Sequence, residues 1–350
     1  MSNQSGIKFL DSIRKYGPHI FRVRSWKRLF SHLFFWLRRR VISGKLDMQK
    51  RKRASYCYNP APRVAGVLQF FNKGQNISML WRGLKAASFD ELIIMDDGSV
   101  DGSSVRWQAL LESPNQFLLR SNDLFEIITY DRALHFSRAE IVCLLQDDDQ
   151  MPNSRAWIDR ALELFDEFPD LLILGGFRAV DILPRNTLPL ADKLVLEVDG
   201  HEEYVSGLFR HRTSQFPLSE TPSGREDFFF AMSVVRAPVF IRRREFLKLG
   251  GFDLDFAPFL CDDLDNCLRA WQSGYKVGLF NVDFQRDIGL GGMRAFNGQR
   301  METQVRLNWE KIYQKHGDVI ASGEVCSMVD AANRVLRVGG ATDGATGRSG

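Results

Sequence analysis

The chain has 350 residues, of which 44% are hydrophobic and 26% charged, so it is long enough to bury a sizeable core. Its net charge of +4 is unevenly spread: residues 1–63 hold 16 Lys and Arg against 2 acidic residues, and the rest holds 31 basic and 41 acidic ones. The acidic main part of the chain argues against a nucleic-acid-binding protein. The 5 cysteines have no metal-ligand spacing, which argues against a disulfide framework or a zinc site and indicates a reduced, cytoplasmic compartment.

The basic segment contains a predicted amphipathic helix over residues 20–41. Its apolar stripe is formed by Trp26, Phe30, Leu33 and Leu37, with arginines around it. The longest uncharged run, residues 29–37, is far shorter than the ~20 residues that a membrane span needs. The helix therefore either lies in an anionic membrane surface, as a peripheral anchor, or packs on the rest of the protein with its basic side in solvent.

From residue 64 onward, apolar strands alternate with helical segments. Strands are predicted at 64–71, 91–95, 117–119, 141–145, 171–175, 234–242 and 276–284, and helices at 77–88, 105–112, 124–137, 154–168 and 302–316. This alternation predicts an α/β fold with a mostly parallel, doubly wound sheet. Residues 181–226 are polar and show no clear periodicity.

The pattern divides the chain into four parts. We expect a basic amphipathic extension and linker over residues 1–63, a catalytic domain over 64–290, and a helical segment over 291–338. The tail over 339–350 is too rich in Gly, Thr and Ser to order itself.

A first acidic cluster follows the predicted strand 91–95. Asp96, Asp97 and Asp101 supply carboxylate acceptors for a uracil ring and a ribose, and Gly98 and Gly102 let the backbone approach a ligand. Strand ends in open α/β sheets are where nucleotides bind. The alternative is an ordinary surface turn, since Asp, Gly and Ser are common in turns.

A second cluster, Asp147, Asp148 and Asp149, follows the predicted strand 141–145. On an extended strand end, residues i and i+2 point the same way, so Asp147 and Asp149 could share one Mg²⁺ or Mn²⁺ and leave positions for phosphate oxygens. The alternative is an acidic start for the helix 154–168.

A third acidic group, Asp262 and Asp263, opens a predicted helix that ends near Gly274. The buried face of this helix is expected to hold Leu264, Cys267, Leu268 and Trp271. The helix dipole keeps a first-turn carboxylate ionised, and a fixed, ionised carboxylate can act as a general base. The alternative is helix capping, with an ion pair between Asp265 and Arg269.

In order and approximate spacing, the three clusters resemble the family 2 glycosyltransferases with the GT-A fold, from about Val64 to Phe284. The matching motifs are Asp96–Asp101 for the nucleotide signature, Asp131–Glu140 for the helix before the metal motif, Asp147–Asp149 for the metal-binding DXD, and Gly250–Asp253 with Asp262–Asp263 for the acceptor loop and the catalytic base. Gln146 before the three aspartates leaves the DXD register open by one residue. No His follows the strand 276–284, which leaves Arg286 as a cation for the diphosphate.

The resemblance implies an inverting, metal-dependent glycosyltransferase of the hexosyltransferase type, which moves one sugar from a nucleoside-diphosphate sugar, first of all a UDP-sugar, to a carbohydrate or lipid-linked acceptor. The residues it implies are Asp96, Asp97, Gly98, Ser99, Asp101, Asp148 and Arg286 for the nucleotide, Asp147 and Asp149 for Mn²⁺ or Mg²⁺, and Asp263 as the base oriented by Asp262. Two alternatives remain: a nucleotidyltransferase on a similar fold, and a non-catalytic scaffold at a membrane surface.

Overall fold

The structure is a computed structural model and describes residues 30–31, 33–38, 40–41, 59–183, 195–198, 201–206, 209–285 and 298–345. The chain divides into two compact units, Met1–Tyr58 and Asn59–Gly350. In the first unit the described residues are helical, and Phe30, Phe34 and Phe35 are each more than 60% exposed. No described helix combines the length and the apolar character that a membrane span requires.

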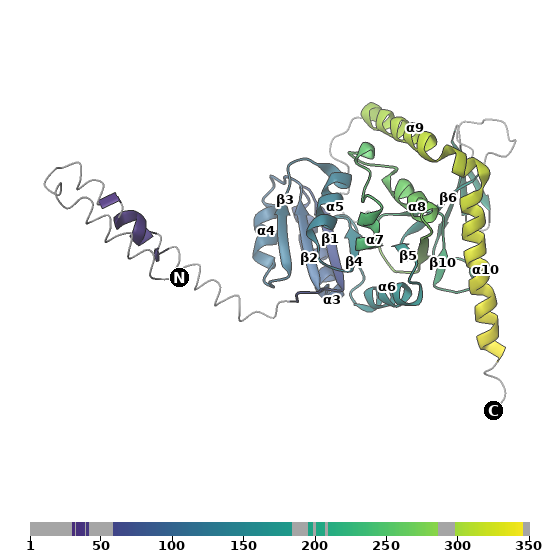
Figure 1. The fold of residues 1–350 in the computed structure, drawn as a ribbon, viewed down its shortest axis with the longest axis horizontal. Helices are drawn as coiled ribbons and strands as arrows, with labels where there is room; N and C mark the ends of the chain where they lie inside the picture. Colours follow the sequence, from purple (N-terminus) through teal and green to yellow (C-terminus); the bar gives the residue numbers. More distant parts are fainter. Residues whose placement is uncertain are drawn as a thin grey trace, which may run out of the picture. The chain divides into compact units, whose positions relative to one another are not determined.

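The second unit is built on a large central sheet flanked by helices (Figure 1). In the part of the chain that the structure describes, the strand order is β10-β13-β5-β12-β4-β1-β2-β3. The strands are β1 (Val64–Phe70), β2 (Glu91–Asp96), β3 (Gln116–Arg120), β4 (Ile141–Leu145), β5 (Leu171–Gly175), β10 (Phe228–Phe230), β12 (Val239–Arg242) and β13 (Lys276–Phe280). The neighbours β3, β2, β1 and β4 are parallel, as are β5 and β13, whereas β12 and β10 run antiparallel to their neighbours. The predicted mostly parallel α/β sheet is therefore confirmed.

The helices follow the strands in the expected alternation. They are α3 (Ile77–Ala87), α4 (Ser103–Leu110), α5 (Phe125–Phe136), α6 (Ala156–Glu167), α7 (Arg243–Lys248), α8 (Asp262–Gln272), α9 (Gly298–Ser322) and α10 (Glu324–Ala345), with short 3₁₀ turns η2 (Gly74–Asn76) and η3 (Leu254–Phe256). The predicted face of α8 is buried, and Gly274 follows the helix with φ of +80°. Both predictions for this helix are confirmed.

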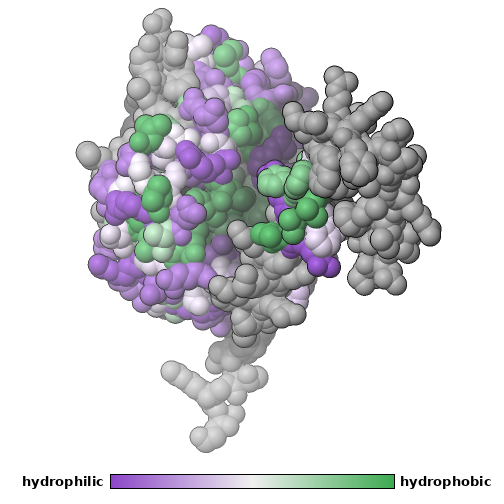
Figure 2. All heavy atoms as spheres, turned by 90° about the vertical axis from the view of Figure 1, so that its left-hand side faces the viewer, coloured by the Kyte–Doolittle hydropathy of each residue, from purple (hydrophilic) through white to green (hydrophobic). Residues whose placement is uncertain are grey.

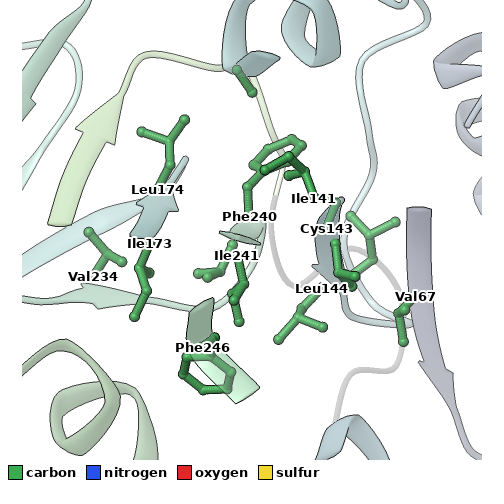
Figure 3. Close-up of a cluster of buried hydrophobic side chains, with 14 of the residues drawn as sticks. Val67, Ile141, Cys143, Leu144, Ile173, Leu174, Val234, Phe240, Ile241 and Phe246 are labelled. Carbon is green, nitrogen blue, oxygen red and sulfur yellow. The ribbon is translucent and has the colours of Figure 1, made fainter. Parts of the chain in front are cut away.

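Apolar strands bury both faces of the sheet, which is why their sequences are almost continuously hydrophobic. Every residue of β2, β4 and β5 is buried. Figure 3 shows Phe240 and Leu174 on one side of the sheet and Ile241 and Ile173 on the other, as their pairing in adjacent strands requires.

The outer edge of the central sheet is less buried. The edge strand β3 has no fully buried residue. The face that carries α4, next to this edge, is mainly hydrophilic with separate hydrophobic patches (Figure 2). Val100 and Val105 are its clearest exposed apolar side chains, and single exposed residues of this kind are normal on soluble proteins.

A second, antiparallel sheet lies in the region where the sequence shows no periodicity. Within the described residues its order is β11-β6-β9-β8-β7, formed by β6 (Arg178–Leu183), β7 (Val195–Val198), β8 (His201–Ser206), β9 (Phe209–Gln215) and β11 (Val234–Val235). Polar and apolar residues are mixed in most of these strands, and β8 carries two adjacent glutamates. This sheet is formed by backbone pairing between neighbouring strands, and its strands could not be predicted from an alternation of apolar residues.

Two further predictions are corrected. The predicted strand 234–242 is two strands in different sheets, β11 and β12, because Pro238 lacks the N–H that a continuous ladder needs. Helix α10 lies largely within the helical segment predicted over 291–338, but it runs to Ala345, into the segment expected to be an unordered tail from residue 339. Once a helix is nucleated, each added residue costs little, which allows it to extend through a weak sequence.

Candidate active site

A cavity of about 770 Å³ lies at the carboxyl ends of β1 and β4. One part of its lining follows these two strands and includes Lys73, Asp147 and Asp148. Another part comes from Arg236 and the first turn of α8. Its size is within the usual range of ligand sites, and its position is where α/β sheets bind ligands.

The carboxylates of the first acidic cluster lie outside this lining. Asp97 is fully buried and accepts hydrogen bonds from the backbone N–H groups of Leu124 and Phe125, at 2.9 and 2.8 Å, and from the Ser121 hydroxyl. It therefore ties the start of α5 to the end of β2. Because Asp97 is fully buried, a uracil could contact its carboxylate only if the surrounding chain moved.

Asp96 is also fully buried, where it accepts from the backbone N–H of Ser99 at 2.9 Å and from the Ser104 hydroxyl, and its Oδ2 lies 3.2 Å from Arg120. Its bonds keep the loop after β2 folded around Gly98, whose φ of +92° favours glycine. The predicted nucleotide residues Asp96, Asp97 and Gly98 are thus brought together, but both carboxylates are buried and none of the three residues lines the cavity.

Ser99 and Asp101 connect this loop to the loop after β1. The Ser99 hydroxyl accepts from the N–H of Asn72 at 2.9 Å, and the Asp101 carboxylate accepts from the N–H of Gly74 at 2.9 Å. These two bonds fix the backbone on both sides of Lys73. The nucleotide signature therefore positions a lysine that does line the cavity.

The second cluster does not have the geometry expected from an extended strand. The chain turns at Asp147 and Asp148 directly after β4, so carboxylates two residues apart do not point the same way. Asp147 and Asp148 line the cavity, whereas Asp149 is 1% exposed and lies outside its lining. Asp147 and Asp148 are thus the two aspartates of this cluster in the cavity lining, and the predicted sharing of a metal ion by Asp147 and Asp149 stays a prediction.

The ammonium group of Lys73 lies between these two carboxylates. Its Nζ is 2.7 Å from Asp147 Oδ1 and 3.0 Å from Asp148 Oδ2, and the side chain is only 10% exposed. The other oxygen of Asp147 accepts from the N–H of Phe71 at 2.9 Å. Burial alone would lower the pKa of Lys73, but the two carboxylates outweigh it and raise the pKa, so the ammonium remains charged.

The fold family implies a divalent cation, and the carboxylates of Asp147 and Asp148 fit one. They converge on a single buried positive charge, that of Lys73, which marks a position suited to a cation. Mg²⁺ and similar ions are commonly held by one or two carboxylates together with substrate phosphates and water. Among the side chains that the structure describes, no three His, Cys, Asp or Glu residues form a metal-binding group.

Arg236 is the centre of the third acidic group. Its guanidinium is 5% exposed, pairs with both carboxylate oxygens of Asp262, and lies 3.3 Å from Asp263 and 3.2 Å from Glu126. The N–H of Arg236 also donates to Asp263 at 3.2 Å. One buried cation thus holds three carboxylates, two from the first turn of α8 and one from α5.

Tyr130 links this group to the second cluster. The Arg236 guanidinium lies over the Tyr130 ring, 5.1 Å from its centre, and the Tyr130 hydroxyl donates to the carbonyl of Leu145 at 2.7 Å. Leu145 is the last residue of β4 and comes just before the turn with Asp147. The two charged groups are therefore fixed relative to each other through a buried aromatic side chain.

Asp262 and Asp263 differ in what they can do. Asp262 is 1% exposed and engaged by Arg236 through both oxygens, whereas the Asp263 side chain keeps 23% of its surface exposed. Burial raises the pKa of Asp263 to about 7, against the opposing effect of Arg236 and with a further rise from Asp262. Such a carboxyl group can exchange a proton near neutral pH, as a general base must.

The far end of the cavity is apolar and aromatic. It is lined by Val180 and Ile182 of β6, His211 of β9 and Trp309 of α9, with the two rings 4.7 Å apart. Burial lowers the pKa of His211 to about 4, so its imidazole is neutral at pH 7. The second sheet and α9 therefore form a wall that suits an uncharged ligand.

Lys73, Glu126 and Arg236 were missed from the sequence, and Arg286 lies outside the described residues. Arg236 did carry a signal, because it is a charged residue two positions before Pro238 in an otherwise apolar run. Lys73 follows the predicted strand 64–71, in a segment that is only a poor version of the Gly-rich, basic loop expected of a nucleotidyltransferase. Glu126 carried no signal, because nothing local distinguishes it from a surface residue of a helix.

An α/β fold with charged groups around a cavity at its strand ends is typical of an enzyme that binds a nucleotide. Residues 67–216 match the model of the family Glycosyl transferase family 2. Over these 150 of its 350 residues, the chain is similar to the family 2 glycosyltransferases. The match ends before Arg236 and α8, so the roles of Asp262 and Asp263 depend on the geometry alone.

Among solved structures, the chain is similar to a crystal structure of GalNAc-T7 with UDP, GalNAc and Mn²⁺. The TM-score is 0.51 at 12% sequence identity, and the match covers 76% of this chain and 51% of that chain. The chain thus spans about half the length of that chain, and the likeness confirms the predicted GT-A fold. None of the curated proteins compared with the chain matches it.

Proposed function

We propose that the protein is an inverting glycosyltransferase that moves one sugar from a nucleoside-diphosphate sugar to an acceptor hydroxyl. One observation carries the proposal: a single cavity holds both the Asp147–Lys73–Asp148 group and the Arg236–Asp262–Asp263 group. The first suits a diphosphate and its cation, and the second suits proton abstraction. The family match supports sugar transfer over transfer of a nucleotidyl group.

In the proposed reaction, Asp263 takes the proton of the acceptor hydroxyl as that oxygen attacks the anomeric carbon. The bond from this carbon to the diphosphate oxygen breaks on the opposite face, which inverts the configuration, and the diphosphate leaves with the electron pair. Arg236 and Asp262 position Asp263. A divalent cation held by Asp147 and Asp148 would supply positive charge for the departing diphosphate.

The donor is proposed to be a UDP-sugar, since the similar GalNAc-T7 structure contains UDP and Mn²⁺. Ser99 and Asp101 serve nucleotide binding by holding the loop around Lys73, and Asp96 and Asp97 serve it by holding the loop after β2 and the start of α5. Arg286 remains a proposed partner of the diphosphate. The apolar end of the cavity, with His211 and Trp309, is proposed to take a carbohydrate acceptor or one with a lipid part.

A panel of nucleotides and nucleotide sugars tests this function. With Mn²⁺ present, UDP is expected to raise the melting temperature, and at least one UDP-sugar should be hydrolysed slowly to UDP when no acceptor is added. Alkyl glycosides added next should outcompete free sugars as acceptors if the apolar end binds the lipid part. A protein that neither binds a nucleoside diphosphate nor hydrolyses any nucleotide sugar would contradict the proposed donor class.

We further propose that the helix containing residues 30–41 lies on anionic membrane surfaces. Phe30, Phe34 and Phe35 expose apolar surface beside arginines, which matches the charge and hydrophobicity of such an interface. This proposal would bring a cytoplasmic active site to a membrane-bound acceptor.

Removal of residues 1–43 is expected to weaken binding to vesicles that contain anionic lipid. The double variant Phe34→Ser and Phe35→Ser of the full chain is expected to weaken this binding as well. Binding by the unmodified protein should also fall as salt rises, because the basic charges are screened within about 8 Å at physiological ionic strength. Vesicle co-sedimentation measures both effects. Unchanged binding would contradict the membrane role, and a truncated protein that unfolds would favour a helix packed on the domain.

A further inference from the structure

Lys73 occupies the position that suits a cation in the proposed donor site. Its Nζ lies 2.7 and 3.0 Å from oxygens of Asp147 and Asp148, and this side chain reaches the cavity from the loop after β1. A divalent cation bound to the same oxygens would stand within contact distance of the ammonium. Two positive charges that close repel each other strongly, so both cannot occupy this position together.

The loop around Lys73 is built so that its side chain can move while its backbone stays. Asn72 is held by the Ser99 hydroxyl, Gly74 is held by the Asp101 carboxylate, and Gly74 also accepts a hydrogen bond from the Arg106 guanidinium. These contacts fix the main chain. The lysine side chain has a flexible four-carbon stem and three donors, which suits a group that changes partners.

We propose that Lys73 is an exchangeable counter-ion: it holds Asp147 and Asp148 until a divalent cation binds, and then turns to the diphosphate of the donor. This inference rests on the proposed function for the identity of the donor. It explains why a lysine accompanies two carboxylates in one cavity, since the pair is never left without a positive partner. It also gives the hydrogen bonds of Ser99 and Asp101 a purpose, which is to position this lysine.

Lys73→Met tests the exchange through metal binding, without any need for activity. Free of competition from the ammonium, the variant should bind Mn²⁺ about tenfold more tightly than the unmodified protein when no nucleotide is present. It should then bind UDP about tenfold more weakly at saturating Mn²⁺, because it lacks one charged hydrogen bond to the diphosphate. Isothermal titration with Mn²⁺, and then with UDP, measures both. Lys73→Arg keeps the charge and is expected not to tighten Mn²⁺ binding.

Arg106→Met is the matched control, because it removes a positive charge on α4 that contacts the same loop, at the carbonyl of Gly74, and does not pair with Asp147 or Asp148. Arg106→Met should change the Mn²⁺ affinity less than threefold. A gain in Mn²⁺ affinity as large as that of Lys73→Met would show a general effect of charge and would overturn the exchange. The milder variant Lys73→Gln serves as a second test. The exchange is also overturned if either Lys73→Met or Lys73→Gln binds Mn²⁺ no more tightly than the unmodified protein does. If Mn²⁺ binds as expected but UDP binds to none of the proteins, the exchange stands as metal competition and the proposed donor is wrong.

Discussion

Replacement of Asp263 by asparagine is expected to lower sugar transfer by ~10²-fold or more, the usual scale for a missing general base. The amide keeps the size and the hydrogen-bond acceptor of the side chain but cannot take the acceptor proton. Donor affinity should change little, since Asp263 belongs to the Arg236 group and not to the Asp147–Lys73–Asp148 group. Steady-state kinetics with calorimetric titration of the donor separates the two quantities.

The pH profile gives an independent check on this residue. Burial raises the pKa of Asp263 to about 7, and the charged groups that face it are Arg236, Asp262 and Glu126. Because the base must be ionised, kcat/KM should rise with pH up to about 7 and level off above it. A flat profile between pH 5 and 8 would contradict the assignment.

Two variants complete the test of Asp263. Asp159→Asn removes an exposed carboxylate on α6 that pairs with Arg155, so it should leave transfer unchanged. Asp262→Asn is expected to act less strongly than Asp263→Asn, because Asp262 is engaged by Arg236 through both oxygens. An inactive Asp262→Asn with an active Asp263→Asn would make Asp262 the base.

Arg236→Met is expected to destabilise the protein by ~3–5 kcal/mol, the usual cost of removing one partner from a buried ion pair. The substitution leaves the carboxylates of Asp262, Asp263 and Glu126 close together without their shared cation. Repulsion among these carboxylates and the loss of their hydrogen bonds to Arg236 both lower the free energy of unfolding. Urea unfolding at pH 8, where the carboxylates are ionised, should show the largest difference.

The matched control for this loss is Arg306→Met, at an exposed ion pair with Glu310 on α9, which should cost less than about 0.5 kcal/mol. A double variant that combines Arg236→Met with Asp262→Asn should lose less stability than the two single losses added, because the arginine and the carboxylate are direct partners. Additive losses, or a change from Arg236→Met no greater than that of the control, would contradict the role of Arg236 as the shared cation.

The sequence by itself determined most of the central sheet and the location of the charged clusters, but it did not predict β10 or the division of residues 234–242 into two strands. Strands such as β2 and β4 are buried on both faces, so their apolar runs were visible without a structure, and the acidic residues at their ends marked the edge of the sheet. The helix α8 was equally clear, because its apolar spacing and Gly274 are local signals.

Only the tertiary structure decided which of these residues share the cavity. Asp97 and Asp149 have the same carboxylate chemistry as Asp147 and Asp263, but neither lines the cavity. Asp97 is buried and bound by backbone N–H groups, and Asp149 is buried after the turn that follows β4. Arg236 reaches three carboxylates because Pro238 divides one predicted strand between two sheets. A sequence pattern reports the spacing of residues along one element, whereas ion pairs and cavities depend on how separate elements meet, and that is set by packing between residues far apart in the chain.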